Sequence, residues 1–474
     1  MNLFTEFLKR NKQKRISVGV IGDSMIDEYY YVNVKKISPE FPIPVMHSDT
    51  STPTYSLPGG AANVAYQFKH FNADVKLISC IDSEAHRVFA SHGIDCTWSH
   101  RISTPIPRKR RFYSDDFPTY RWDVETNYKS HMSDAWPQIF SLFQKRHQFF
   151  DVLIFSDYNK GFFSKSVADD LIHNFSNCRY RIVDPKKDLS LWKGCTLIKP
   201  NYSEACDLTG STHPQEQMAR IRDICECEMV MVTMGGKGVQ GEHFGHKDSD
   251  FSYEPRTSIS PNSVIGAGDC FMAFTAMGLA YDFMLPEIAE IAFEMGALYV
   301  QEKHNSPISI EKILKRFDPE AAKYIVPKLP RDYSLAFSNG CFDLLHRGHI
   351  ETLKFAKSKA EKLVVAVNTD ESVAKLKPGR PINCLANRMS VLAALEFVDY
   401  VVSFSEDTPY ELIKKLKPDV LVKGEPYCIH NVVGADLVDK VYIAPKFEDL
   451  SSTGVIKKWE ELKKNCQVKD LEVL

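Results

Sequence analysis

Residues 337–357 read FSNGCFDLLHRGHIETLKFAK and predict, in order, a buried strand, a tight turn and a helix. Similar apolar runs that end in a small or polar turn recur along the chain, among them SVGVIGD, DVLIFSD and LVVAVNTD. Longer amphipathic stretches separate many of these runs. Strands that alternate with helices indicate a mainly parallel sheet covered by helices on both faces. The sequence therefore predicts an α/β protein.

The chain has 474 residues, which is too long for one ordinary hydrophobic core. Within residues 311–334 a polar helical pattern gives way to a stretch with Pro327 and Pro330, after which strands and helices alternate again. We predict a first domain at residues 1–318, a linker at 319–332 and a second domain at 333–474. The segment FPIPVMHSD and residues 101–125 have strand-like alternation, and we expect them to form a separate small sheet.

The bulk composition excludes several classes of protein. The formal net charge is −2, whereas a protein that mainly binds nucleic acid is usually basic. No apolar run approaches the roughly 20 residues that span a bilayer, and the N-terminus lacks the apolar core of a secretory signal. The 12 cysteines are scattered without CxxC spacing, which is typical of reduced thiols. We expect a cytoplasmic enzyme for small molecules, with no nucleic-acid or membrane partner.

The segment SVIGAGDCFMAFTAMGLA (263–280) carries the first candidate site. Gly266, Ala267 and Gly268 precede Asp269, and an apolar helix follows. Small residues let backbone N–H groups converge on an anion, and the positive end of a helix dipole adds to this. Asp269 could accept a proton from an attacking hydroxyl group. The structural alternative is an aspartate that merely caps a helix beside a glycine turn.

Three further strand-end or small-residue turns accompany it: LPGGAANVAYQF (57–68), IKPNYSEA (198–205) and VTMGGKGV (232–239). In this order they resemble the ribokinase-like, or PfkB, family of sugar kinases over about residues 15–310. The resemblance implies that Asp269 is the catalytic base and that Gly266, Ala267 and Gly268 form the anion hole. It implies magnesium held through phosphates at Asn201 and Glu204. It implies nucleotide contacts at Asn201, Tyr202, Ser203, Glu204, Thr233, Gly235 and Gly238, and sugar contacts at Asp23, Asp27, Gly59, Gly60, Asn63 and Asp184.

The basic run RKRR (108–111) falls where a lid strand of this family would lie. Lys109 and Arg111 could bind a phosphate already present on the sugar, or they could form a solvated strand face. The tripeptide at 263–265 is Ser-Val-Ile, where the family usually has Asp-[Val/Thr]-Thr. This departure leaves activation by a monovalent cation open.

His346 and His349 form the second candidate site. Histidines three apart lie on one face of a first helical turn, where they could donate to a phosphate; a buried hydrogen-bonded pair and a zinc site without a clear third ligand are the alternatives. The sequence that contains these histidines resembles the HxGH nucleotidyltransferases of the cytidylyltransferase-like group, over about residues 335–465. The resemblance implies catalytic roles for both histidines. It implies nucleotide contacts at Asn339, Gly340, Phe342, Asp343, Lys377, Arg380, Arg388, Ser451, Ser452 and Thr453.

The two halves together, with the motifs SDYNKG, RPIN and VVSFSEDTP, resemble the bifunctional heptose kinase/adenylyltransferases of lipopolysaccharide core synthesis. The resemblance implies a ribokinase-like parallel sheet with a small β lid, followed by a Rossmann-like nucleotidyltransferase domain. It also implies ATP and Mg²⁺ as cofactors, a homodimer, and ADP-heptose as product. Two alternatives remain open: a sugar kinase fused to a cytidylyltransferase for another sugar or polyol phosphate, and a degenerate kinase-like scaffold with only the transferase active.

Overall fold

The computed structural model describes residues 2–48, 50–115, 117–146, 149–175, 178–245, 250–255, 261–302, 304–327, 329, 331–424 and 428–445. The chain divides into two compact units, Met1–Ile313 and Leu314–Leu474. Both are built from a mainly parallel sheet with helices, which confirms the predicted α/β class.

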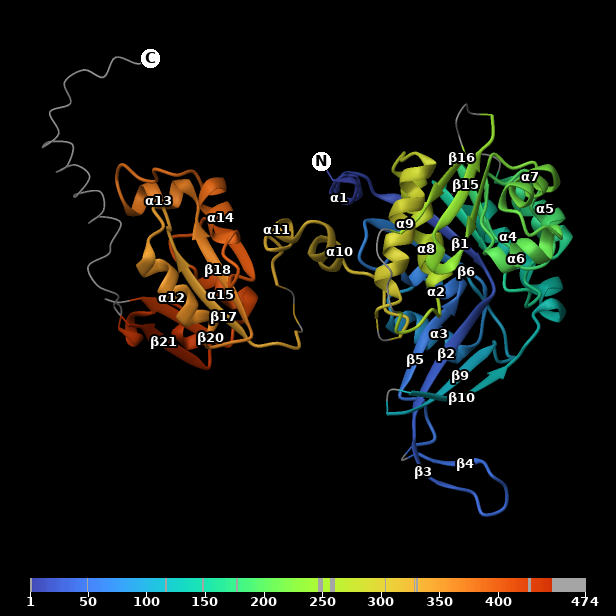
Figure 1. Ribbon diagram of the computed structural model, residues 1–474, viewed down its shortest axis with the longest axis horizontal. Helices are drawn as coiled ribbons and strands as arrows, with labels where there is room; N and C mark the ends of the chain where they lie inside the picture. The colour runs from blue at the N-terminus through green and yellow to red at the C-terminus, as the bar shows by residue number, and fades with distance from the viewer. Residues whose placement is uncertain are drawn as a thin grey trace, which may run out of the picture. The chain divides into compact units, whose positions relative to one another are not determined.

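The centre of the first unit is an eight-stranded sheet (Figure 1). Its strands from β14 to β6 run parallel, and β15 and β16 add an antiparallel edge. Central strands such as β1 and β11 are buried along nearly their whole length, because both faces of the sheet are covered. In spatial order the strands are β16 (Asp250–Tyr253), β15 (Val239–His243), β14 (Met229–Thr233), β13 (Leu197–Ile198), β12 (Tyr180–Asp184), β11 (Val152–Ser156), β1 (Ile16–Gly22) and β6 (Ala73–Ile78).

Helices cover this sheet on both sides (Figure 1). Helices α2, α8 and α9 pack against one another on one side, and α5, α6 and α7 lie on the other. Helix α8 is buried from Asp269 to Ala280, which explains its uniformly apolar sequence. The helices of this unit are α1 (Leu3–Gln13), α2 (Ala61–Tyr66), α3 (Ser83–Ser91), α4 (Lys129–Arg146), α5 (Lys165–Asn174), α6 (Tyr202–Thr209), α7 (Pro214–Cys225), α8 (Ala267–Ala280) and α9 (Leu285–Tyr299). Helix α10 (Ile310–Phe317) spans the boundary between the units, and α11 (Pro319–Ala322) belongs to the second.

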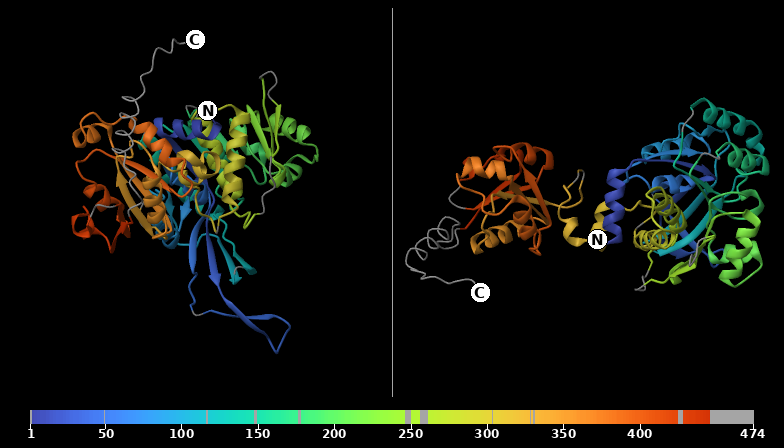
Figure 2. Two further views of the ribbon diagram at one scale, coloured as in Figure 1. Left: turned by 60° about the vertical axis from the view of Figure 1, so that its left-hand side comes forward. Right: turned by 90° about the horizontal axis from the view of Figure 1, so that it is seen from above.

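A separate four-stranded sheet forms the lid of the first unit. It has the order β10 (Phe117–Val124), β9 (Arg108–Ser114), β2 (Ser24–Tyr31) and β5 (Tyr55–Gly60). The expectation that FPIPVMHSD and residues 101–125 share one small sheet is wrong. Strands β3 (Asn33–Ile37) and β4 (Pro44–His47) pair only with each other, and Figure 2 shows their hairpin extending away from the main sheet. The short pair β7 (Cys80–Ile81) and β8 (His100–Arg101) completes the unit.

The second unit contains a five-stranded parallel sheet, as its repeated strand–helix pattern predicts. Its order is β19 (Tyr400–Phe404), β18 (Lys362–Asn368), β17 (Leu335–Gly340), β20 (Val420–Gly424) and β21 (Lys440–Ala444). The strand order reverses direction beside β17, and ligands in open parallel sheets bind at such a point, beyond the carboxyl ends of the strands. The helices are α12 (Arg347–Lys357), α13 (Asp370–Leu376), α14 (Leu385–Ala393) and α15 (Tyr410–Leu416).

In the part of the chain that the structure describes, no helix is both long enough and apolar enough to cross a membrane. All of the cysteines described are free thiols, and most are buried.

Gly22 ends the central strand β1 at a point where only glycine fits. Its φ is +145°, and a Cβ atom there would lie 2.0 Å from the carbonyl oxygen of Ser156. We predict that Gly22→Ala lowers the free energy of unfolding of the first unit by about 3–5 kcal/mol, because strand β11 must move to relieve the clash. Urea denaturation followed by the fluorescence of the buried Trp98 and Trp192 measures this loss.

Gly93→Ala is the matched control for this variant. Gly93 also has a positive φ, +81°, but a Cβ atom there meets nothing within 4 Å. The control should therefore cost only the conformational strain, about 1 kcal/mol. Equal losses in the two variants would contradict the steric explanation.

Candidate active sites

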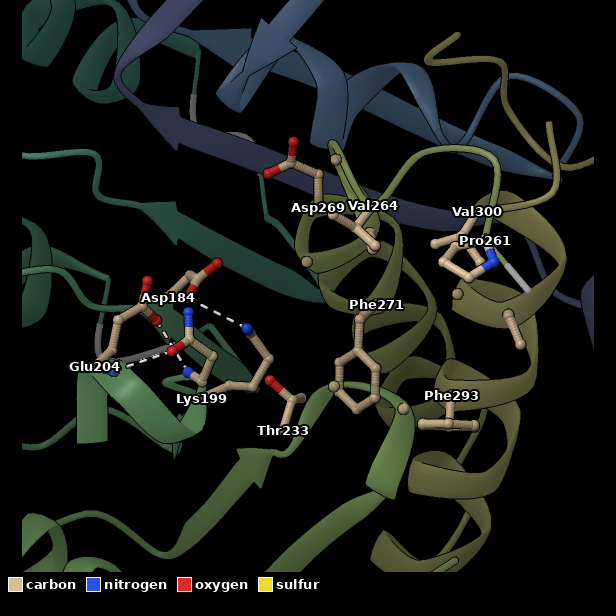
Figure 3. Close-up of a pocket in the computed structure, with 18 of the residues that line it drawn as sticks. Asp184, Lys199, Glu204, Thr233, Pro261, Val264, Asp269, Phe271, Phe293 and Val300 are labelled. Atoms are coloured by element: carbon tan, nitrogen blue, oxygen red, sulfur yellow. Dashed lines mark hydrogen bonds and ion pairs between the residues drawn. The ribbon is translucent and has the colours of Figure 1, made fainter. Parts of the chain in front are cut away.

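The first unit contains a pocket of about 470 Å³ at the carboxyl ends of β12, β13 and β14. Figure 3 shows its two unlike walls: Asp184, Lys199, Glu204 and Thr233 gather on one side, and Val264, Phe271, Phe293 and Val300 on the other. Gly235 and Gly238 also line the pocket. A polar wall with a lysine suits phosphates, and an apolar wall suits a flat base. On the polar wall, Glu204 and Thr233 were predicted as nucleotide contacts, whereas Asp184 was predicted as a sugar contact. Lys199 and the apolar residues were not predicted from the sequence.

Asp269 lies in the first turn of α8 and closes one end of this pocket. Only 3% of its surface is exposed. The Tyr158 hydroxyl donates to its Oδ1 at 2.6 Å, and Asn63 Nδ2 donates to its Oδ2 at 2.7 Å. Burial raises the pKa of Asp269 to about 6, against the effect of these two donors. The carboxylate is thus ionised near neutral pH but far more basic than usual, which suits a general base.

The turn before Asp269 has the geometry expected of an anion site. Gly266 is the N-cap of α8 with φ +76°, and Ala267 and Gly268 form the first helical positions. A Cβ atom on Gly266 would lie 2.5 Å from the Tyr299 hydroxyl and 2.6 Å from Asn63 Nδ2. The first N–H groups of a helix lack carbonyl partners within it and point toward whatever lies beyond its end. All three small residues line the pocket.

Asn201 and Glu204 have a structural reason for their spacing as well as a place on the polar wall. Each side chain accepts the backbone N–H of the other at 2.9 Å, which makes a capping box at the start of α6. Glu204 is also paired with Lys186, and Asp184 with Lys199 at 3.2 Å. Burial raises the pKa of Asp184. Within the described residues, no three His, Cys, Asp or Glu side chains are clustered to hold a metal.

The chemistry of this wall fits magnesium bound through a nucleotide. Mg²⁺ is commonly held by one or two carboxylates together with substrate phosphates rather than by a complete protein cage. Glu204 supplies such a carboxylate beside Asn201, and Lys186 and Lys199 lie on the same wall.

The predicted sugar residues at the lid fall into one buried cluster. Arg111 Nη1 donates to Asp27 Oδ1 at 2.7 Å, and Asn305 Nδ2 donates to Asp27 Oδ2 at 2.6 Å. A Cβ atom on Gly59 would lie 2.8 Å from Asp27 Oδ2, so glycine allows this close approach. Arg111 Nε is buried without a hydrogen-bond partner in the described structure. An unsatisfied guanidinium nitrogen is consistent with an anionic ligand here. Sequence reasoning missed Asn305, which follows α9.

The remaining predicted sugar-binding residues, Asp23, Gly60 and Asn63, contact other parts of the protein. Both carboxylate oxygens of Asp23 accept backbone N–H groups, from Tyr158, Lys160 and Phe162, at 2.9 to 3.2 Å. Asp23 is fully buried, and its carboxylate holds this loop through these bonds. Gly60 is the N-cap of α2, and Asn63 on that helix is fully buried against Asp269.

Tyr202 and Ser203 lie on the exposed side of α6, outside the lining of the pocket. The Tyr202 hydroxyl donates to the Thr212 carbonyl oxygen at 3.0 Å. Their positions in the motif reflect the helix start rather than a contact with the pocket.

In the second unit, His346 is the N-cap of α12 and His349 lies in its first turn. Their imidazole rings stack with centroids 3.8 Å apart, and the ring of Phe342 packs edge-on to His349 at 5.3 Å. Both Nδ1 atoms are buried without a hydrogen-bond partner in the described structure. This excludes the alternative of a buried pair satisfied through these atoms, and it leaves two polar atoms for a ligand.

Electrostatics keeps these histidines neutral. Burial, followed by the charges of His346 and Lys377, lowers the pKa of His349 to about 4. Burial also lowers the pKa of His346. Lys423, at the end of β20, donates to the Asn339 carbonyl oxygen at 3.2 Å, and burial lowers its pKa to about 8. Sequence reasoning missed Lys423; its place directly after an apolar strand was the available signal.

Three of the predicted nucleotide residues support the loop instead. Asp343 accepts Arg380 Nη1 at 2.7 Å and the backbone N–H groups of Ile382 and Asn383. Arg388 has a fully buried side chain and donates to the Cys341 carbonyl oxygen at 2.6 Å. These bonds fix the turn after β17 against the segment that follows Lys377. Asn339 and Gly340 end β17, and a Cβ atom on Gly340 would lie 3.2 Å from the Phe342 ring. Ser451, Ser452 and Thr453 lie outside the described residues.

Comparisons with known proteins match the two parts of the chain to two different families. A family model for pfkB family carbohydrate kinases matches residues 16–312, and one for cytidylyltransferase-like proteins matches residues 337–469. The chain is 33% identical to the bifunctional protein HldE of Paramagnetospirillum magneticum, over 92% of this chain and 95% of that protein. It is 33% identical to that of Azotobacter vinelandii, over 94% and 97%.

Among solved structures, phosphofructokinase-2 of Escherichia coli superposes with a TM-score of 0.51 at 16% identity. The match covers 64% of this chain and 98% of that one. At this identity the likeness shows the fold alone. The predicted ribokinase-like fold and the separate nucleotidyltransferase fold are confirmed.

The low pKa of His349 is directly testable. We predict that its imidazole titrates with a midpoint near pH 4 in the ligand-free protein, whereas an exposed histidine titrates near 6.5. NMR of the ring protons as a function of pH measures this midpoint. Lys377→Ala should raise the midpoint, because it removes a positive charge that disfavours the imidazolium. A midpoint above about 6 in the unmodified protein would contradict the burial described.

Proposed function

Because this chain belongs to the HldE family of bifunctional proteins, we propose that it phosphorylates C1 of D-glycero-β-D-manno-heptose 7-phosphate and later converts heptose 1-phosphate to ADP-heptose. It is a carbohydrate kinase over its first part and a nucleotidyltransferase over its second. ADP-heptose would then serve lipopolysaccharide core synthesis. A separate phosphatase removes the C7 phosphate between the two steps.

In the kinase reaction, Asp269 takes the proton of the C1 hydroxyl as that oxygen attacks the γ-phosphorus of ATP and the bond to ADP breaks. The amides at Gly266, Ala267 and Gly268 stabilise the charge on the phosphoryl group in transfer. Magnesium on the nucleotide supplies further charge neutralisation, and Asn201 and Glu204 would hold it through the phosphates. Arg111 and Lys109 bind the C7 phosphate from the lid.

One observation carries the kinase half of this proposal. A buried carboxylate with a pKa of about 6 stands at a helix N-terminus, in a pocket with one phosphate-like and one base-like wall. A scaffold without catalysis has no need of this arrangement, since removing a carboxylate from water costs stability that hydrogen bonds only offset. The degenerate-kinase alternative is therefore not favoured.

In the transferase reaction, a phosphate oxygen of heptose 1-phosphate attacks the α-phosphorus of ATP, and pyrophosphate leaves. No general base is needed, because the sugar phosphate is already an anionic nucleophile. His346 and His349 donate to the α-phosphate, and Lys377 binds the departing pyrophosphate. Ser451, Ser452 and Thr453 are predicted to hold the triphosphate. The rival reading, CTP with another sugar or polyol phosphate, differs in the nucleotide consumed.

The remaining assignments follow from this chemistry. ATP and Mg²⁺ serve both reactions, and the sugar phosphates and nucleotides are the ligands. We propose that the protein acts in the cytoplasm, where ATP is supplied. We also propose a homodimer, as the resemblance to the kinase family suggests.

Two single variants should separate the activities. Asp269→Asn removes the base and should lower kinase kcat by about 10²–10⁴ while leaving the transferase unchanged. His349→Ala removes a donor and should lower transferase kcat by about 10²–10³ while leaving the kinase unchanged. Both activities are measured by release of ADP and of pyrophosphate. Loss of both activities in either folded variant would contradict two independent sites.

Phosphorus NMR tests the substrates. With ATP, magnesium and heptose 7-phosphate, the protein should produce a new sugar 1-phosphate signal. Addition of a C7-specific phosphatase should then yield the paired signals of a nucleotide diphosphate sugar with ATP but not with CTP. Turnover of heptose 1-phosphate without any reaction of heptose 7-phosphate would show that the kinase has another substrate.

A further inference from the structure

Tyr158 stands where the sugar side and the nucleotide side of the kinase site meet. It follows β11 in the motif SDYNKG, lines the pocket, and donates its hydroxyl to Asp269 Oδ1 at 2.6 Å. The ammonium groups of Lys109 and Lys186 lie over its ring, 5.3 and 5.6 Å from the ring centroid. Lys109 comes from the lid strand β9, and Lys186 is paired with Glu204 of the nucleotide wall.

We propose that Tyr158 is a positioning residue of the kinase reaction. Its hydroxyl orients and stabilises the ionised carboxylate of Asp269, and its ring sets the positions of the two lysine ammonium groups that face the anionic substrates. This rests on the proposed function, in which Asp269 is the base.

The hydroxyl is fixed as a donor. Burial, together with the charge of Asp269, raises the pKa of Tyr158 well above its usual value, so the phenol stays protonated at every pH at which the enzyme works. A hydrogen bond to the charged form of an acid lowers its pKa. The Tyr158 hydroxyl and Asn63 Nδ2 are the two side-chain donors that act in this way on Asp269.

Hydrogen bonds to buried carboxylates hold the loop that carries Tyr158. The backbone N–H of Tyr158 donates to Asp23 Oδ2 at 2.9 Å, and those of Lys160 and Phe162 donate to the same carboxylate. Asp23 is fully buried at the end of β1. The Asn159 N–H donates to Asp157 Oδ1 at 2.7 Å. A loop with its amides tied in this way presents the tyrosine in one position, as a positioning role requires.

The ring has a separable part in this arrangement. Ammonium groups are attracted to the face of an aromatic ring, and the face remains when the hydroxyl is removed. Tyr158→Phe therefore removes only the bond to Asp269, whereas Tyr158→Leu removes the ring as well.

Several charged and polar groups face Asp269 and act on the same titration. Asp184 raises the pKa of Asp269 and Lys109 lowers it. The groups that surround it are Tyr158 from the loop after β11, Asn63 from α2, Tyr299 from α9, Asp184 from β12, Lys109 from β9 and Lys186 from the loop after β12. None of these groups other than Tyr158 is altered in the test.

The test is the pH dependence of kinase kcat/KM for the sugar phosphate. A base acts only when ionised, so activity falls as pH drops through its pKa. In Tyr158→Phe the carboxylate loses a stabilising donor, its pKa rises, and the acid limb should move to higher pH by about one unit. KM for ATP and sugar phosphate should change less than about twofold, because the aromatic ring beneath both lysine ammonium groups remains. The phosphate of the substrate also titrates and affects the pH profile, but it does so equally for every variant. The difference between two variants therefore does not contain it.

Tyr158→Leu should show the same shift of the acid limb together with a severalfold rise in both KM values. Tyr281→Phe is the matched control, since the buried Tyr281 hydroxyl also donates to a side-chain oxygen, Asn11 Oδ1, at 2.9 Å, away from the pocket. It should leave the pH profile unchanged. The transferase activity of each preparation provides an internal measure of enzyme concentration.

An acid limb that does not move in Tyr158→Phe overturns the inference, whether activity is kept or lost; loss without a shift would mark a purely structural tyrosine. Unchanged KM values in Tyr158→Leu overturn the role of the ring. Failure of the proposed function is distinguishable, because Asp269→Asn would then retain kinase activity whatever Tyr158 does.

Discussion

The burial of Asp269 is the constraint on which the kinase site depends. A carboxylate that is almost wholly removed from water needs donors to remain ionised, and Asn63 and Tyr158 supply them from a helix and a loop distant in sequence. Each donor is in turn held by the protein: Gln67 donates to Asn63, and Asp23 fixes the loop of Tyr158. Gly266 completes the arrangement, because any side chain there would collide with Asn63 and Tyr299. Residues from several separate elements thus fix the surroundings of this one carboxylate.

The two candidate active sites share two features, a helix start and a buried ionisable group, although the group is an acid in one and a histidine in the other. In each, a helix begins at a turn with small or polar residues, and its first backbone N–H groups point beyond the helix end, where a phosphate can bind. Burial disfavours charge in both sites, which raises the pKa of Asp269 and lowers that of His349. A carboxylate made more basic suits proton abstraction from a sugar hydroxyl. A histidine kept neutral carries one N–H donor for a phosphate without competing for a proton.

Several features were readable from the sequence because they are local. The turns GAGD and HRGH combine small residues, a preceding apolar run and a following helix, all within a few residues, so Asp269, His346 and His349 could be identified as candidates. The spacing of Asn201 and Glu204 also has a local cause, the capping box. Asp23, Asp343 and Arg388 show the limit of this reasoning. Each carries a residue type that suits a ligand, yet the structure satisfies each of them with backbone groups or side chains of the protein.

The sequence by itself therefore determined the α/β class and identified two candidate phosphate-binding turns and the candidate catalytic groups, because hydrophobic periodicity and turn geometry are fixed by near neighbours along the chain. Only the tertiary structure decided which polar groups meet. Tyr158 reaches Asp269 across 111 positions and Asn63 reaches it across 206, and Lys109 joins them from a strand of the lid. Such contacts depend on how strands are ordered in the sheets and on which loops they bring together, and the pKa of a buried group depends on those contacts.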